Sequence, residues 1–492
     1  MRKRSYFVIF MTLVLSTATL FSCASDGISE NTTTSGDPNA STDTATSDST
    51  SLVAEIPDVK YDGYEFKILG GKIGSMSYAV QEEIFADEQN GEPLNDALYD
   101  RNKMVEGKLG VTIVKVESDN VAQDMSKSVM AADEAYDAAL DTITAHVSGI
   151  NGGVVTDLTE LPYVDIDKPW WNKNAIDTAS IANKSYLLFG DLNYSDKNST
   201  WALVFNKRLY EENGLEEPYE MVRNGEWTLE KLEEQCRDIT QDLNGDTVLD
   251  HNDQWGLLSS DSAVIGFITS CGIKTIETDS AGEFVFSLDS ERNVGALSSL
   301  YNFFSNGQIQ LRAQAMDGLV PDIWTEIINI FKEGRALYRI TTLSDVATMR
   351  DMEDDFGILP LPKLDAEQDS YYSTYQAWSG RCYVVPKGGS DLERTSAILE
   401  YMCSVSTDTL IDAYYDVTLQ RKVSRDDESA EMLDIIFDSY TSDIGLTYEI
   451  GGLRDLIQNM MKASSDTVVS TLASKKESVM SAAEKLYDAV NE

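Results

Sequence analysis

The sequence predicts an α/β protein of two lobes, joined by crossing strands, with a ligand cleft between the lobes. The first observation is an alternation of apolar runs and helical patterns from residue 64 to 143, which is typical of a parallel sheet with crossover helices. The second is the length of 492 residues, which suits two or three domains. The third is a polar, tyrosine-rich link between two buried apolar runs, at 356–361 and 382–385. Such a link is typical of a chain that leaves one lobe and enters the other.

The first 22 residues predict a secretory signal. Residues 2–4 are basic, and residues 6–15 form an apolar core that is too short to span a membrane. The following LFSC segment resembles a bacterial lipobox, which implies cleavage before Cys23 and lipidation of its thiol. Ordinary secretion with a free Cys23 is the alternative. The expected location is outside the cytoplasm, lipid-anchored to the bacterial cell membrane.

Residues 23–57 are expected to form a flexible tether that begins at the lipidated cysteine. Half of residues 24–51 are Ser or Thr, and this stretch has no lysine, arginine or aromatic residue. Such a composition cannot bury enough apolar surface to offset the entropy that is lost on ordering. A coil of this length would hold a domain roughly 30 Å from the membrane.

Strand and helix patterns then define the start of the folded part. Residues 64–69 and 111–116 are predicted strands, separated by a helix with Pro93 near its start and Gly110 past its end. A second helix at 121–133 and a third strand at 137–143 follow. Because ligands of open α/β sheets bind beyond the carboxyl ends of the strands, the residues after the third strand are expected at the cleft. These residues are Thr144, His146 and Ser148, and for His146 a buried structural histidine is the alternative.

Two motifs resemble a known family, and further matches recur in order over nearly all of the chain beyond its first sixty residues. Residues 357–363, GILPLPK, and 383–387, YVVPK, resemble strand ends of the extracellular solute-binding proteins of ABC importers, family 1, the sugar-type group. The resemblance implies a periplasmic-binding-protein-like fold of type II. It assigns residues 58–198 and 326–378 to the first lobe, and residues 199–325 and 379–492 to the second.

The resemblance also implies crossings between the lobes near residues 191–199, 335–342 and 375–378. The second of these is expected to return the chain to the first lobe. Polar and aromatic residues at these places are expected to face the cleft, and the two rings near the last crossing would pack against the apolar face of a sugar. The residues are Asn193, Tyr194, Thr341, Thr342, Tyr375 and Trp378, of which the last two are those rings.

A twelve-residue acidic loop from residue 242 has the spacing of an EF-hand calcium loop. Oxygen-bearing side chains fall at positions 1, 3, 5, 9 and 12, and position 7 offers its carbonyl. Position 6 is Thr247 rather than glycine, and position 12 is aspartate rather than glutamate. A structural calcium site and a plain acidic surface turn therefore both stay open. The calcium ligands would be Asp242, Asn244, Asp246, Val248, Asp250 and Asp253.

Composition narrows the possible partners. The net charge of −44 disfavours nucleic acid, because phosphate binding needs a basic face. The chain has two histidines and none of the motifs HExxH, GxSxG or GxxxxGK[ST], so we expect no catalytic residue and no required cofactor. The resemblance implies three partners, which are a carbohydrate ligand, the permease subunits of an ABC transporter and, through the lipid, the membrane. We expect the protein to act as a monomer.

The predicted function is therefore the capture of a carbohydrate, an oligosaccharide, by closure of the lobes, and its delivery to a membrane permease. Two other functions stay open. A surface-tethered glycan-active enzyme would need a cleft carboxylate pair about 5–9.5 Å apart. A calcium-dependent adhesion or scaffold module would need the acidic loop to hold calcium.

Overall fold

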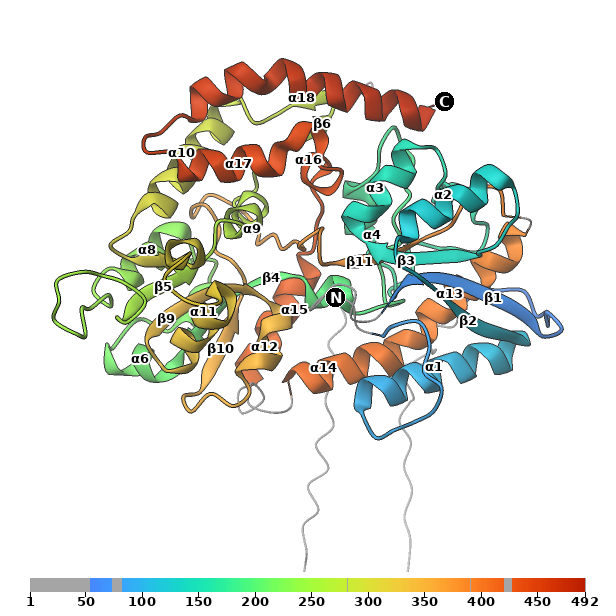
Figure 1. Ribbon diagram of the computed structural model, residues 1–492, viewed down its shortest axis with the longest axis horizontal. Coiled ribbons are helices and arrows are strands. Elements are labelled where there is room, and N and C mark those ends of the chain that lie inside the picture. Colours follow the sequence, from blue (N-terminus) through green and yellow to red (C-terminus); the bar gives the residue numbers. More distant parts are fainter. Residues whose placement is uncertain (1–53, 73–81, 281, 390, 420–426, 492) are drawn as a thin grey trace, which may run out of the picture. The chain divides into compact units, whose positions relative to one another are not determined.

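The computed structural model describes residues 54–72, 82–280, 282–389, 391–419 and 427–491. They form two sheets and one small hairpin, with helices packed around the sheets (Figure 1). Among these residues, none of the helices is long and apolar enough to cross a membrane. The predicted signal segment, Cys23 and the tether up to residue 53 lie outside the described residues.

The first lobe is built on a four-stranded sheet in the order β11-β3-β1-β2. β1 pairs in parallel with both β2 and β3, whereas β11 joins the edge next to β3 in the antiparallel direction. The strands are β1 (Tyr64–Gly71), β2 (Val111–Ser118), β3 (Ala138–Thr142) and β11 (Arg381–Val384). The helices are α1 (Pro93–Leu109), α2 (Val121–Ala131), α3 (Ile143–Asn151), α4 (Lys173–Thr178), α13 (Leu392–Ser406) and α14 (Asp412–Leu419).

The predicted strand–helix alternation at the start of this lobe is confirmed. α1 begins at Pro93, whose missing N–H has no helical partner to lose there, and ends at Leu109. Gly110 follows in the left-handed conformation, with a φ of +65°, and its N–H donates to the carbonyl of Glu106. α1 and α2 carry the chain back over the sheet, as parallel pairing requires.

The second lobe is built on a five-stranded sheet in the order β10-β4-β9-β5-β8. β5 is parallel to β8 and β9, whereas β4 is antiparallel to β9 and β10. Every residue of β4 and β9 is buried, including Arg339, Thr341 and Thr342 of β9. The strands are β4 (Trp201–Asn206), β5 (Trp255–Ser259), β8 (Gln310–Arg312), β9 (Ala336–Thr342) and β10 (Phe356–Leu359), and the separate hairpin is β6 (Ile276–Thr278) with β7 (Phe284–Phe286).

Helices surround this second sheet. The longer ones are α8 (Leu229–Cys236), α9 (Ala263–Ser270), α10 (Glu291–Ser305), α11 (Ile323–Lys332), α15 (Asp427–Asp438) and α17 (Leu453–Lys462). The short ones are α5 (Ser195–Asn198), α6 (Lys207–Glu212), α7 (Pro218–Arg223), α12 (Leu343–Val346) and α16 (Ile444–Thr447). Thr228 is the N-cap of α8, and its side chain accepts the N–H of Lys231.

The sheet pairing corrects the predicted lobe boundaries. Residues 326–378 were assigned to the first lobe, but their strands β9 and β10 pair with β4 in the second sheet. Residues 379–492 were assigned to the second lobe, but β11 pairs with β3 in the first sheet, and α13 packs against α1. The link between β10 and β11 is therefore a crossing, as predicted, but in the opposite direction. Both strands are short and fully buried, so their local sequences do not reveal which sheet each one joins.

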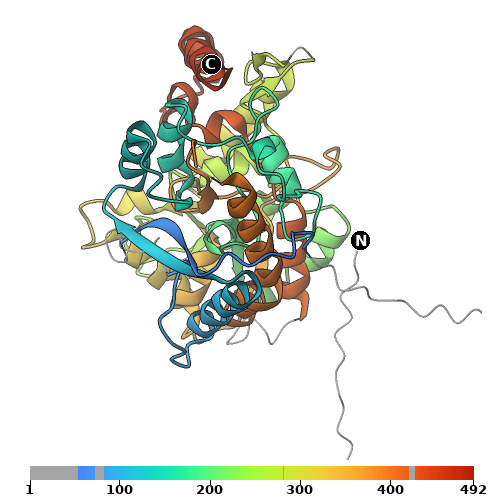
Figure 2. The ribbon, with the colours of Figure 1, turned by 90° about the vertical axis from the view of Figure 1, so that its right-hand side faces the viewer.

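The C-terminal helix α18 (Val468–Asn491) contacts elements of both lobes. It packs against α3 of the first lobe, and Lys184 Nζ donates a hydrogen bond to the carbonyl of Val490. It also packs against β7 and α10, which accompany the second lobe. Figure 1 shows α18 running above α10 and α17 toward α3, and Figure 2 shows it at the end of the molecule away from α1.

Candidate functional site

A cleft of about 1010 Å³ opens along one edge of the second sheet. β5 and β9 are parallel neighbours, so their carboxyl ends meet at this edge, at Ser259 and Thr342. The first turn of α11, the crossing segment around Trp378 and one face of α17 complete the wall. Its volume is at the upper end of the range for ligand pockets in proteins.

Three segments lie side by side next to this cleft, and together we call them the hinge ribbon. They are residues 198–201 and 373–376 of the two crossings, and the strand-like residues 439–441. Residues 198–201 pair antiparallel with residues 373–376, and the Trp201 N–H donates to the carbonyl of Thr374 over 2.9 Å. Ser373 exchanges two backbone hydrogen bonds with residues 439–441, which follow α15. Short crossing segments of this kind are where rotation between two lobes takes place.

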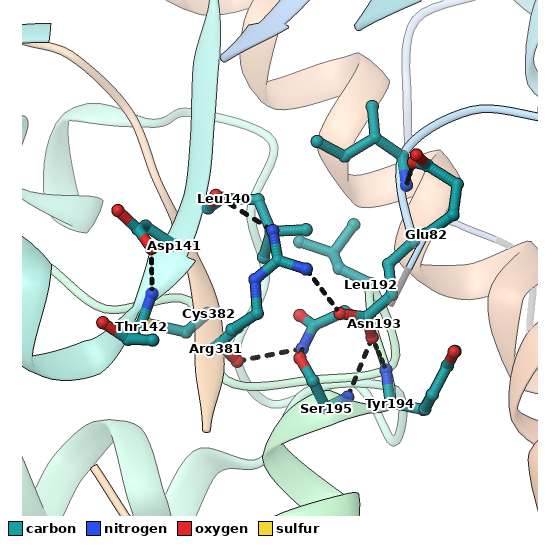
Figure 3. Close-up of polar contacts among 12 residues, drawn as sticks. Glu82, Leu140, Asp141, Thr142, Leu192, Asn193, Tyr194, Ser195, Arg381 and Cys382 are labelled. Carbon is teal, nitrogen blue, oxygen red and sulfur yellow. Dashed lines mark hydrogen bonds and ion pairs between the residues drawn. The ribbon is translucent and has the colours of Figure 1, made fainter. Parts of the chain in front are cut away.

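Arg381, the first residue of β11, connects the first crossing to the first sheet. Its Nη1 lies 3.1 Å from Glu83 Oε2, and both side chains are buried. The other oxygen of Glu83 accepts the N–H groups of Tyr194 and Ser195, each over 2.8 Å. Figure 3 shows the guanidinium between the carbonyl of Leu140 and the turn at 193–195. The two oxygens of Glu83 thus bind Arg381 on one side and the turn at 193–195 on the other, so this buried ion pair holds the turn in one geometry.

The cleft presents aromatic faces beside polar side chains. Trp378 is half-buried, and its ring centre lies 6.5 Å from that of Trp201 in an edge-on arrangement. The guanidinium carbon of Arg454 lies 5.0 Å from the Trp378 ring centre. Trp324, in the first turn of α11, is 50% exposed and also lines the cleft. Exposed indole rings next to hydrogen-bonding groups suit a ligand with both apolar and polar faces.

Carboxylates in the cleft are held by neighbouring groups. Asp345 Oδ2 accepts hydrogen bonds from Arg339 Nη2 at 2.5 Å and from Thr341 Oγ1 at 2.7 Å. Asp322 is the N-cap of α11, and hydrogen bonds from the Thr325 hydroxyl and from the backbone N–H groups of the first turn hold its pKa below the usual range.

Three of the predicted substrate-binding residues line the cleft, namely Thr341, Thr342 and Trp378. The two threonines stand at the carboxyl end of β9, but β9 stays in the second sheet and does not return the chain to the first lobe, contrary to what the resemblance implied. Both hydroxyls already have protein partners, since Thr342 Oγ1 lies 2.7 Å from Ser344 Oγ and Thr341 Oγ1 donates to Asp345.

The predicted pair of rings does not form. Tyr375 is buried in the hinge ribbon, where its ring stacks on Phe189 at 5.2 Å and its hydroxyl lies 2.8 Å from Ser442 Oγ. Tyr375 pairs with Thr200 in this ribbon, whereas Trp378 lies in the turn that follows at 377–379 and packs edge-on against Trp201. Asn193 and Tyr194 are also buried, beside the Glu83–Arg381 pair, and do not line the cleft.

The structure places the residues after β3 away from the cleft. α3 begins at Ile143, directly after the strand, so Thr144, His146 and Ser148 belong to its turns. His146 is fully buried, its Nε2 lies 3.0 Å from the carbonyl of Cys382, and burial lowers its pKa. Thr144 is half-buried, and the Ser148 hydroxyl donates to the carbonyl of Ala145. None of the three lines the cleft.

Sequence reasoning missed the cleft face of α17 and the first turn of α11. The missed residues are Trp324, Arg454, Asp455, Gln458 and Lys462, together with Ser260, Asp261, Gln314 and Gln376. On α17 the polar residues recur opposite a buried face that contains Leu453 and Ile457. The same stripe is typical of a solvated helix face, so the pattern alone did not separate the two roles.

Aspartate side chains of the acidic loop at 242–253 accept hydrogen bonds from the backbone N–H groups of the same loop. Asp242 accepts the N–H groups of Gly245 and Thr247, over 2.7 and 2.9 Å, and Asp253 is buried and accepts two more. Thr247 has a φ of +71°, the conformation that glycine supplies at this position of an EF-hand. Among the described residues, no three side chains of His, Cys, Asp or Glu lie close enough to hold a metal ion. The calcium site stays a prediction, which a calcium titration of chelator-treated protein would test.

Comparison with known proteins identifies the fold. No family model matches the chain, and no curated protein matches it. Among solved structures, the chain is similar to the ABC substrate-binding protein Lmo0181 from Listeria monocytogenes, in complex with cycloalternan. The identity is 15%, the TM-score is 0.52, and the match covers 85% of this chain and 98% of that chain. The two-lobe α/β fold is therefore that of an ABC substrate-binding protein.

Proposed function

We propose that this chain is the extracellular substrate-binding lipoprotein of an ABC transporter, and that it captures a carbohydrate by closure of its lobes. The observation that carries the proposal is the cleft beside the hinge ribbon, with indole rings and many neutral hydrogen-bonding groups in its wall. A sugar offers an apolar face for such rings and a rim of hydroxyls for such groups. The protein of like fold was solved with cycloalternan, which is a carbohydrate.

The size of the cleft favours an oligosaccharide over a single sugar. A volume of about 1010 Å³ is at the upper end of the range for ligand pockets, which leaves room for more than one sugar ring. The wall extends from Trp324 on α11 to Trp378 on the second crossing, so an extended chain could contact both indoles.

Membrane anchoring and transfer to a permease complete the proposal. The LFSC segment and the Ser/Thr-rich stretch after it support a lipid anchor at Cys23 with a tether. Both lie outside the described residues, so their support comes from the sequence. Mass spectrometry of membrane-extracted protein would find a diacylglyceryl modification on the peptide that begins with Cys23.

A glycan-active enzyme is the second candidate, and the cleft carboxylates disfavour it. A general acid for glycoside hydrolysis needs a raised pKa, whereas the pKa of Asp322 is lowered by its capping hydrogen bonds. Asp345 is engaged by Arg339 and Thr341. Incubation with oligosaccharides is expected to release no reducing sugar.

A thermal-shift screen against mono- and oligosaccharides tests the proposal. We expect a neutral oligosaccharide to raise the melting temperature, because a ligand that binds only the folded state stabilises it by mass action. Calorimetry would then give the affinity, and small-angle scattering would show a smaller radius of gyration with ligand. A broad screen that produced no shift and no compaction would contradict carbohydrate capture.

A further inference from the structure

We infer that this cleft accepts an uncharged solute and rejects an anionic one, and that Asp261 is a residue that sets this specificity. The inference rests on the proposed function and narrows it, because solute-binding clefts of this size could equally hold an acidic oligosaccharide such as a polyuronate. What decides between the two is how the cations of the cleft are compensated.

Each cation among the described residues that line the cleft lies within ion-pair distance of a carboxylate. Arg339 Nη2 lies 2.5 Å from Asp345 Oδ2, and Arg454 Nη1 lies 2.5 Å from Glu449 Oε1. Lys462 Nζ lies 3.4 Å from Asp261 Oδ2. A solute carboxylate would therefore meet only cations whose charge a protein carboxylate already compensates, so it would gain less than from an uncompensated cation. A hydroxyl needs no uncompensated cation, since it only adds a hydrogen bond.

Carboxylates also outnumber cations in this wall. The cleft lining contains Asp261, Asp322, Asp345 and Asp455 against Arg339, Arg454 and Lys462. The whole chain carries a net charge of −44, which adds a negative potential around the site. Like charges brought together in a cleft that excludes water repel strongly, so this balance acts against an anion.

Asp261 contributes most to this charge balance, because its carboxylate compensates two cations at once. Its Oδ1 lies 3.2 Å from Arg312 Nη1, its Oδ2 lies 3.4 Å from Lys462 Nζ, and its side chain is 14% exposed. Its backbone N–H donates to Gln314 Oε1 over 2.9 Å, which keeps it at the end of β5. Without its negative charge, Lys462 in the cleft wall and Arg312, which does not line the cleft, would both lose this shared partner.

Neutral donors and acceptors supply the rest of the wall. Ser259 ends β5, Ser260 and Ser262 follow it, and three glutamines approach from other segments, namely Gln314, Gln376 and Gln458. Hydroxyl and amide groups can donate or accept, so they suit the hydroxyl rim of a neutral sugar. They carry no positive charge that would offset the free-energy cost of removing water from a carboxylate.

The experiment compares matched ligands that differ only in charge. Maltohexaose, cellohexaose and cycloalternan are each oxidised at C6 to the uronate, and part of each product is converted to the neutral carboxamide. Calorimetry then measures the binding of the parent sugar, the carboxamide and the carboxylate to the full chain. We expect the carboxylate to bind at least about tenfold more weakly than its carboxamide, and the difference to shrink in 0.5 M NaCl.

The variant D261N tests the residue assignment. We expect it to reduce the carboxamide-to-carboxylate affinity ratio by at least about threefold, because two cations lose their shared partner. The matched control is D289N, which removes a carboxylate 2.6 Å from Lys476, away from the cleft residues, and should leave the ratio unchanged. If D261N fails to fold, K462Q serves instead and should increase the ratio.

Each outcome decides a separate question. A carboxylate that binds as tightly as its carboxamide overturns the inference while the proposed function stands. If the native protein shows the expected carboxamide-to-carboxylate affinity ratio but neither D261N nor K462Q changes it, that result overturns the role of Asp261. If no neutral oligosaccharide of the panel or of the wider screen binds, the proposed function fails, and the inference fails with it.

Discussion

The guanidinium carbon of Arg454 lies 5.0 Å from the centre of the Trp378 ring, so a residue of α17 covers part of an indole on the crossing segment. Both residues line the cleft, although 76 positions of the chain separate them. The contact places an aromatic face, a cation and the hinge ribbon at one point of the cleft.

We expect Trp378→Ala to weaken oligosaccharide binding by about tenfold or more, because the ring supplies stacking area that no smaller side chain replaces. Calorimetry with the best ligand of the thermal-shift screen would measure the loss. Tyr372→Ala is a suitable control, since Tyr372 is exposed and does not line the cleft. Equal loss in both variants would show that the ring has no specific part in binding.

Breaking the buried Glu83–Arg381 pair should destabilise the fold. Arg381→Met leaves the Glu83 carboxylate buried without its guanidinium, which costs about 3–5 kcal/mol in comparable buried pairs. The double variant with Glu83→Gln should recover part of that loss, because no unpaired charge remains. Urea denaturation of the single and double variants would measure both effects. A single variant as stable as the native protein would contradict the role assigned to the pair.

Stability should fall as the pH rises from about 4.5 to 7. Glu400 is buried, its oxygens accept the indole N–H groups of Trp170 and Trp171 over 3.0 and 2.7 Å, and burial raises its pKa from 4.5 to about 7. The folded state therefore binds this proton more tightly than the unfolded chain. The stabilising effect is complete below the unfolded pKa and is lost as the pH rises through the folded pKa, by up to about 3 kcal/mol.

The variant Glu400→Gln isolates this group. We expect a smaller decrease in the free energy of unfolding between pH 4.5 and 7, because the amide that replaces the carboxyl group does not titrate. Glu477→Gln, which removes an exposed carboxylate, should leave the slope as in the native protein. Parallel pH profiles for all three proteins would show that Glu400 does not account for the dependence.

Thr247→Gly should stabilise the protein. Thr247 has a φ of +71°, which costs a residue with a Cβ atom about 1 kcal/mol or more, and glycine adopts this conformation without that cost. Asp317→Gly is the control, since Asp317 has a φ of −58° and should lose stability from the added freedom of the unfolded chain. Thermal unfolding without added calcium would measure both, and a less stable glycine variant at 247 would contradict the strain.

The sequence predicted elements whose signals lie within one short segment. α1 has Pro93 at its first position, Gly110 beyond its last, and buried residues at helical spacing between them. The direction of the crossing from β10 to β11 was wrong, because it depends on partners far away in the chain. Phe356 pairs with Asn206 and Cys382 with Asp141, and nothing in the strands themselves encodes those partners.

The cleft was predicted less well than the fold, for a related reason. Thr341 and Thr342, expected at the cleft from the family resemblance, line it, whereas His146, which the strand-end rule selected, is buried by the immediate start of α3. Trp324 and Arg454 lie on helices, where exposed and cleft-lining residues share one periodicity. Only the packing of those helices against the second sheet distinguishes them.

The course of α18 has a mechanical consequence. Because this helix packs against α3 of the first lobe and against β7 and α10 of the second, any change in the angle between the lobes must shift one of those contacts. The last turns of α18 therefore restrain rotation between the lobes. A protein domain fused to the end of this helix would act directly on that rotation. Reporter groups that should leave the motion undisturbed belong on another part of the surface.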